Sequence, residues 1–128
     1  MANQAININV AHQIGRYSDA VEVSDPKRLV FVSGTPGLDR SNGKLPPEFE
    51  AQAELAWQNV VDILAAADMR VENIVNLTQH LIRRDDLGSY RDIRSKYLGT
   101  HEPSSMLTFL PELVWPDMLI ELEVVAAE

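Results

Sequence analysis

Two carboxylates near the end of the chain have the spacing for acid–base chemistry. Glu121 and Glu123 alternate with apolar residues, so in an extended strand both acids point to one face. Covering that face would raise the pKa of one carboxylate and suit it to orient or deprotonate water. A solvated strand face is the alternative. We take Glu121 as the candidate catalytic residue, and which of the two acids faces a cleft stays open.

Three polar segments supply candidate ligand-binding residues. A strand-like run ends in Ser33 and Gly34, which leaves backbone N–H groups available to an anionic or carbonyl ligand. Ser105 lies in a polar break before another strand, and Arg16 and Tyr17 belong to a polar cluster near the start of the chain. Each segment has a structural alternative, namely a tight turn, a hydroxyl cap or a packed tyrosine.

Several chemistries and partners are not expected. The chain has no cysteine, its three histidines share no metal-ligand spacing, and its glycines match no nucleotide-binding loop, so we expect no metal and no cofactor. The net charge of -8 disfavours nucleic acid as a partner. There is no basic, apolar leader and no apolar run of about 20 residues, so we expect a cytoplasmic protein without membrane contact.

The elements that must position these residues fit a single α/β domain over residues 1–128. The apolar patterns predict, in order, a strand over 17–23 paired as a hairpin with a strand over 27–33, a loop over 34–47, a helix after Pro46-Pro47, a strand over 73–82, a helix capped by Asp85-Asp86 and ended by Gly99, and strands over 106–110 and 118–126. This order favours a mixed sheet with both helices on one face. Copies of the chain would cover the other face.

These segments together resemble the RidA/YjgF family over nearly the whole chain. The resemblance is carried by residues 14–20, by Val32-Ser33-Gly34, by the Q-x-x-x-x-x-x-N-V-x-x-I-L pattern over 52–64, and by Pro103 with the strand that holds Glu121. It implies a chorismate-mutase-like homotrimer with clefts between subunits, and the hydrolysis of reactive enamines and imines to keto acids and ammonia. It also implies that the carboxylate at Glu121 positions water and that an arginine just after Pro103 grips the substrate carboxylate.

The arginine is absent here, because Ser105 stands at its place. A hydroxyl cannot reproduce the bidentate clamp of a guanidinium. Arg16, Arg83 and Arg84 are the alternative sources of charge, with Arg16 preferred. Two functions therefore stay open: an imine or enamine deaminase with different substrate anchoring, and a non-enzymatic ligand-binding or regulatory trimer. Ribonuclease activity ranks behind both because the chain is acidic.

Overall fold

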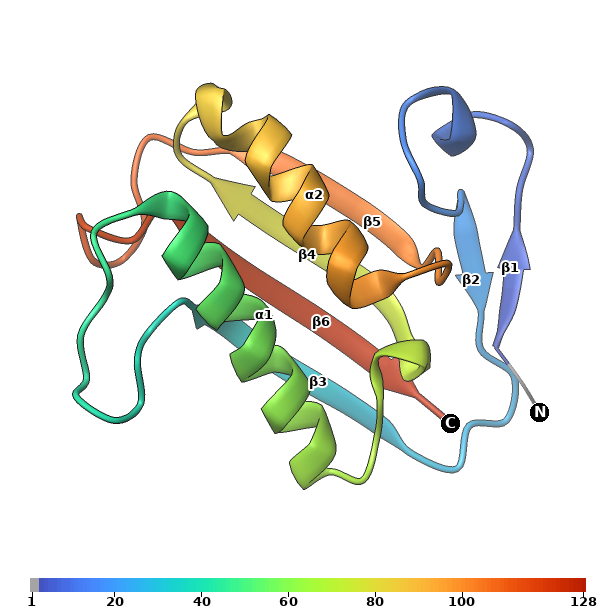
Figure 1. Ribbon diagram of the computed structural model, residues 1–128. Helices are drawn as coiled ribbons and strands as arrows, with labels where there is room; N and C mark the ends of the chain where they lie inside the picture. Colours follow the sequence, from blue (N-terminus) through green and yellow to red (C-terminus); the bar gives the residue numbers. More distant parts are fainter. Residues whose placement is uncertain (1–2) are drawn as a thin grey trace.

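The structure, a computed structural model, describes residues 3–128. Four strands form the main sheet and two helices cover one of its faces (Figure 1). Across the sheet the strands are β3 (Leu29–Pro36), β6 (Ile120–Ala127), β4 (Ile74–Leu81) and β5 (Ser104–Phe109). The helices are α1 (Phe49–Ala66) and α2 (Leu87–Leu98), with short 3-10 turns at Ala11–Gln13, Val71–Asn73 and Arg84–Asp86. The predicted mixed sheet with both helices on one face is confirmed.

The first helix packs on the sheet through the stripe that its sequence predicts. It begins two residues after Pro46-Pro47, and its core-facing residues are buried: Phe49, Ala53, Ala56, Trp57, Val60 and Leu64. Ile63, which the pattern also assigned to this face, is 40% exposed. The stripe is therefore narrower than the sequence suggested, and it centres on Trp57, which is fully buried.

The second helix ends at the predicted glycine, but its first turn lacks the predicted side-chain cap. Gly99 has a φ of 60°, a conformation that L side chains rarely adopt, and it terminates α2. Tyr90 and Ile93 are buried, and the ring of Tyr97 stacks on Trp57 with centroids 5.7 Å apart. The predicted side-chain cap is wrong: Asp86 precedes the helix, but its carboxylate accepts hydrogen bonds from Arg83 instead of capping backbone N–H groups.

Strand pairing departs from the prediction at the N-terminal end of the chain. Residues Ala20–Glu22 (β2) do not form a hairpin with β3; they pair antiparallel with Gln4–Ile6 (β1) as a separate two-stranded sheet. At the other end, β5 runs parallel to β4, while β6 inserts between β3 and β4 and is antiparallel to both. The last two strands are therefore not neighbours, because β4 lies between them; the crossover through α2 allows β5 to run parallel to β4.

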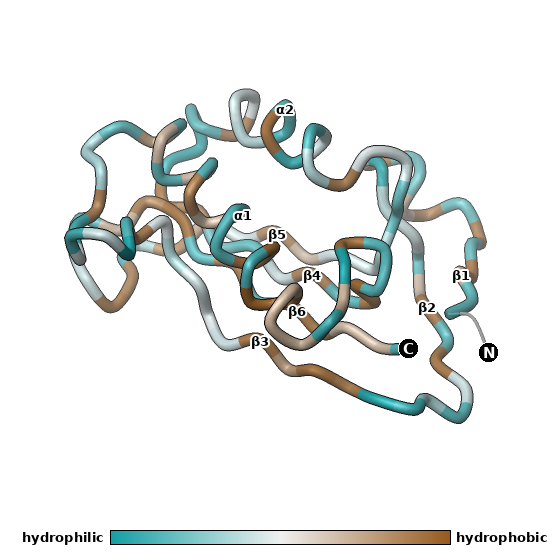
Figure 2. Tube along the Cα trace, turned by 60° about the horizontal axis from the view of Figure 1, so that its bottom comes forward, coloured by the Kyte–Doolittle hydropathy of each residue, from teal (hydrophilic) through white to brown (hydrophobic). Residues whose placement is uncertain are grey.

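The face of the main sheet away from the helices is not covered by any described segment (Figures 1 and 2). Phe31 is 74% exposed and Met106 is 60% exposed near its two margins. Between them lie polar side chains of β4 and β6, so the open face has apolar margins and a polar middle. In residues 3–128, neither helix combines the length and apolar character needed to cross a membrane.

Candidate functional site

The acidic strand lies in the middle of the sheet and presents both candidate carboxylates to the open face. Ile120, Leu122 and Val124 are at most 1% exposed beneath the helices. Glu121 and Glu123 alternate with them and therefore point the other way, as predicted. Glu121 is half-buried and Glu123 is exposed.

Gly34 lies against Glu121, and Ser33 precedes it in a β-bulge of β3. The register shifts between Val32 and Thr35, so Ser33 and Gly34 together oppose one residue of β6. A Cβ added to Gly34 would lie 2.8 Å from Cδ of Glu121, which is closer than real Cβ contacts. Glycine at this position therefore leaves the space that the Glu121 carboxyl group occupies.

A histidine that the sequence reasoning set aside is the other neighbour of Glu121. His80 on β4 is paired in register with Glu121, and its Nδ1 lies 2.7 Å from Oγ1 of Thr108 on β5. Gly34, Glu121, His80 and Thr108 thus form a row across the open face. The alternation of the strand could have indicated this position, because Leu81 is buried under the helices and its neighbour His80 must therefore point to the open face.

Ser105 points to the opposite face of the sheet. It is paired in register with the buried Leu77, and its Oγ accepts a hydrogen bond of 2.8 Å from Nε2 of Gln79. Gln79 is fully buried, and its Oε1 accepts hydrogen bonds from the hydroxyl of Tyr90 at 2.7 Å and from Nη1 of Arg94 at 2.9 Å. Ser105 therefore belongs to a polar network under α2 and not to the row around Glu121.

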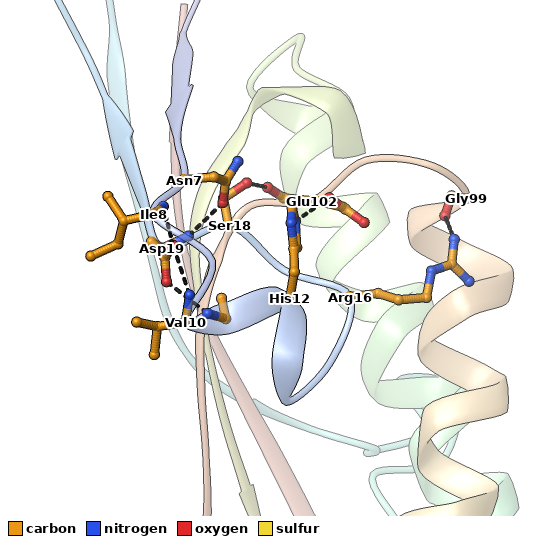
Figure 3. Close-up of polar contacts among 10 residues, drawn as sticks. Asn7, Ile8, Val10, His12, Arg16, Ser18, Asp19, Gly99 and Glu102 are labelled. Carbon is orange, nitrogen blue, oxygen red and sulfur yellow. Dashed lines mark hydrogen bonds and ion pairs between the residues drawn. The ribbon is translucent and has the colours of Figure 1, made fainter.

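Tyr17 belongs to an N-terminal loop that the neighbouring Ser18 and Asp19 hold in place by hydrogen bonds (Figure 3). The Asp19 carboxylate accepts hydrogen bonds from the amides of Ile8 and Ala11, each at 2.7 Å, and these bonds lower the pKa of Asp19. Ser18 bonds to the chain just before β5, with its amide donating to the carbonyl of Pro103 at 3.0 Å. The loop therefore places Tyr17 over the start of β5.

A hollow of about 340 Å³ lies between this loop, α2 and β5. It is lined by Ile14, Gly15, Tyr17, Leu87, Arg91, Arg94, Ser105, Met106 and Leu107. The structure thus brings Tyr17 and Ser105 together, as it does Gly34 and Glu121, with Ser33 next to Gly34 in the bulge. It does not bring Ser105 and Glu121 together within one chain, because their side chains lie on opposite faces of the sheet.

Of the three arginines that the sequence analysis considered as sources of charge, Arg16 is near this hollow, because its neighbours Gly15 and Tyr17 line it. Its side chain is exposed and donates to the carbonyl of Gly99 at 3.1 Å (Figure 3). Arg83 is paired with Asp86 at 2.8 Å, and the guanidinium of Arg84 lies over the ring of Phe109. Arg83 and Arg84 are therefore engaged elsewhere.

The sequence reasoning missed Arg94 and Arg91 on α2. Arg94 is half-buried; burial lowers its pKa, and the like charges of Arg91 and Arg16 lower it further. Arg94 follows the buried Tyr90 by four residues, so the helical period places it beside the apolar stripe. That spacing was the available signal. In residues 3–128 no three His, Asp or Glu side chains group so as to hold a metal ion.

The chain has clear relatives. The sequence profile described as Endoribonuclease L-PSP matches residues 8–128. The chain belongs to the RidA/YjgF family. The 2-iminobutanoate/2-iminopropanoate deaminase of Mus musculus is 38% identical over 92 residues, which are 71% of this chain and 66% of the mouse protein, just under two thirds of its length.

Other RidA/YjgF relatives match over more of the chain. The RutC family protein UK114 of Drosophila melanogaster is 32% identical over 119 residues, which cover 92% of this chain and 83% of that protein. Among solved structures, the Rid protein YyfB of Yersinia pestis has a TM-score of 0.85, with both chains fully covered and 22% identity. The fold of this chain is therefore the Rid fold along its whole length.

Proposed function

We propose that this protein hydrolyses small imino acids, or their enamine tautomers, to oxo acids and ammonia. The observation that carries the proposal is Glu121, a half-buried carboxylate against Gly34 that makes no hydrogen bond within residues 3–128. A carboxylate without a fixed partner is available to a water molecule. The 38% identity to a protein named an imine deaminase supports the same chemistry.

In this reaction Glu121 acts as a general base. Water adds to the carbon of the C=N bond while the Glu121 carboxylate takes one proton from it. For the protonated imine, Glu121 then passes this proton to the carbinolamine nitrogen, and as ammonia leaves, the Glu121 carboxylate takes the proton of the new hydroxyl group. The C–N bond breaks as the C=O bond forms, and no oxidant or cofactor enters the balance.

The proposed site lies between copies of the chain in a homotrimer. The side chain of Ser105 points under α2 and Glu121 points to the open face, while Tyr17 lies at the β5 edge and lines hollows on both sides, so one copy alone cannot present Ser105 and Glu121 to one ligand. The open face also leaves Phe31 and Met106 exposed, and β5 is an edge strand. Association through these surfaces would bury them and bring Ser105 of one copy and Glu121 of another together.

A second candidate, a trimer that binds a metabolite without converting it, is favoured by the hydrogen bond between Ser105 and Gln79. The residue at this position is turned into the protein interior and carries no charge for a substrate. Ribonuclease activity, which the profile name suggests, is disfavoured by the net charge of -8.

The test is ammonia release from 2-iminopropanoate and 2-iminobutanoate generated in the assay. We expect turnover by the wild type and a loss of about 100-fold or more in Glu121→Gln. Glu123→Gln is the matched control, since it makes the same change on the same face of the same strand, and it should retain activity. Equal turnover in both variants would contradict the role of Glu121. Oxo acid binding without turnover by the wild type would support the binding protein.

A further inference from the structure

Three arginines converge at the C-terminal end of α2. Arg16 from the N-terminal loop joins Arg91 and Arg94 in lining a second hollow, which also includes His101 and shares Arg91 and Arg94 with the hollow beside Ser105. None of the ion pairs formed within residues 3–128 includes any of the three arginines. Like charges at close range repel one another, so this cluster in an acidic chain indicates a site that an anion neutralises.

Of the three arginines, Arg94 has the side chain that buried neighbours hold most closely. Its Nη1 donates to Oε1 of Gln79 at 2.9 Å, and its guanidinium lies over the ring of Tyr90, 5.4 Å from the centroid. Gln79 is itself fixed, because it is fully buried and also bonded to Tyr90 and Ser105. A guanidinium held in this way keeps its other N–H groups for a ligand and loses little freedom on binding.

We propose that Arg94 is the anchor for the carboxylate of the ligand, with Arg91 and Arg16 adding positive charge around it. The inference rests on the proposed function, and it names the group that replaces the absent arginine at Ser105. Arg94 and Ser105 hydrogen-bond to the same glutamine and line the same hollow. The positive charge is thus supplied by Arg94 on α2, which lies in the same hollow as Ser105 on β5.

The preferred ligand is therefore a small 2-imino or 2-oxo acid. The hollow of about 340 Å³ is at the small end of ligand pockets and also contains apolar Ile14, Leu107 and Met106. It suits a short aliphatic chain next to the charged group. Glu121 of a neighbouring copy would then face the carbon adjacent to the carboxylate.

The experiment compares, by calorimetry on the full chain, the affinity for 2-oxobutanoate with that for its neutral methyl ester. We expect the wild type to prefer the acid by about 10- to 100-fold. In Arg94→Gln the preference should fall close to one. Arg70→Gln, which changes an exposed arginine that lines neither hollow, should keep the full preference. The ratio of two affinities is not moved by a general loss of stability.

Two further variants keep the test decisive. Adding Ser105→Arg to Arg94→Gln should restore much of the preference by returning a guanidinium to the same hollow. If Arg94→Gln does not fold, Arg94→Lys replaces it; the lysine keeps the charge but loses the planar fork, so the preference should fall by about tenfold.

The proposal is overturned if the wild type binds acid and ester equally, or if Arg94→Gln keeps the preference. Inorganic phosphate that competes as strongly as 2-oxobutanoate would also overturn it, since the site would then select oxyanions in general. Failure of the proposed hydrolysis has a different signature. In that case the wild type shows no ammonia release, while the Arg94-dependent preference for the acid remains.

Discussion

Replacing Gln79 by leucine should be among the most destabilising single changes in this chain. Leucine is similar in size, so the packing is largely kept, but all four hydrogen bonds of the amide are lost: to Ser105, to the carbonyl of Met106, and from Tyr90 and Arg94. Ser105 and Arg94 can turn toward water. The Tyr90 hydroxyl cannot, because the residue is fully buried.

The magnitude follows from counting these groups. A stranded buried hydroxyl costs about 1–3 kcal/mol and each lost hydrogen bond about 1 kcal/mol, partly offset by the added apolar burial, so Gln79→Leu should cost about 2–4 kcal/mol. Tyr90→Phe leaves Gln79 bonded to Arg94 and should cost about 1 kcal/mol. The double variant removes the stranded hydroxyl and should therefore cost about 1 kcal/mol less than the sum.

Urea unfolding at a fixed protomer concentration measures these free energies. Gln58→Leu is the matched control, since Gln58 is exposed and bonds only to Asp62 one helical turn away; it should stay within about 0.5 kcal/mol of the wild type. The reasoning is refuted if Gln79→Leu also stays within that range, or if the double variant costs the full sum.

Three further outcomes are expected. Gly34→Ala should fold but lose most of its imine hydrolysis, because the new methyl group displaces the Glu121 carboxyl group; normal turnover would show that this contact is unimportant. Gly88→Ala, which adds a methyl group in open space near the start of α2, should raise the free energy of unfolding by up to about 1 kcal/mol in the same urea assay, and a decrease would contradict this. The pKa of Asp19 is lowered from 3.8. The stability that its carboxylate gives the loop is therefore complete above pH 3.8 and is lost as the pH falls through the folded-state pKa. Hydrogen exchange at the Ile8 amide, corrected for intrinsic rates, should therefore lose protection in acid, and Asp19→Asn should remove this dependence on pH.

The elements with long periodic patterns could be predicted from the sequence. The stripe of α1, the alternation of β4 and the glycine after α2 each follow from local geometry, and the structure places them within a few residues of the prediction. Strand partners could not be predicted in the same way. The three-residue strands β1 and β2 carry no periodic signal, and nothing local states that β6 inserts between β3 and β4.

Of the site residues, too, those placed by local geometry could be predicted and those placed by long-range contacts could not. The common face of Glu121 and Glu123 follows from the period of a strand, and the contact of Glu121 with Gly34 needs only a neighbouring strand and a bulge. Arg94 was missed because an arginine on an amphipathic helix is normally solvated. Its position depends on Gln79, a polar residue on the buried face of β4, and that pairing is long-range.

The most direct test of the whole account is complementation between two inactive variants. Glu121 and Arg94 lie on opposite faces of the sheet in one chain, so the proposed site must take them from different copies. Glu121→Gln and Arg94→Gln, each inactive alone, are co-expressed and allowed to assemble at random. About a quarter of the sites should then regain both residues, and ammonia release should recover to about that fraction of the wild type. A mixture no more active than its components would contradict a site shared between copies.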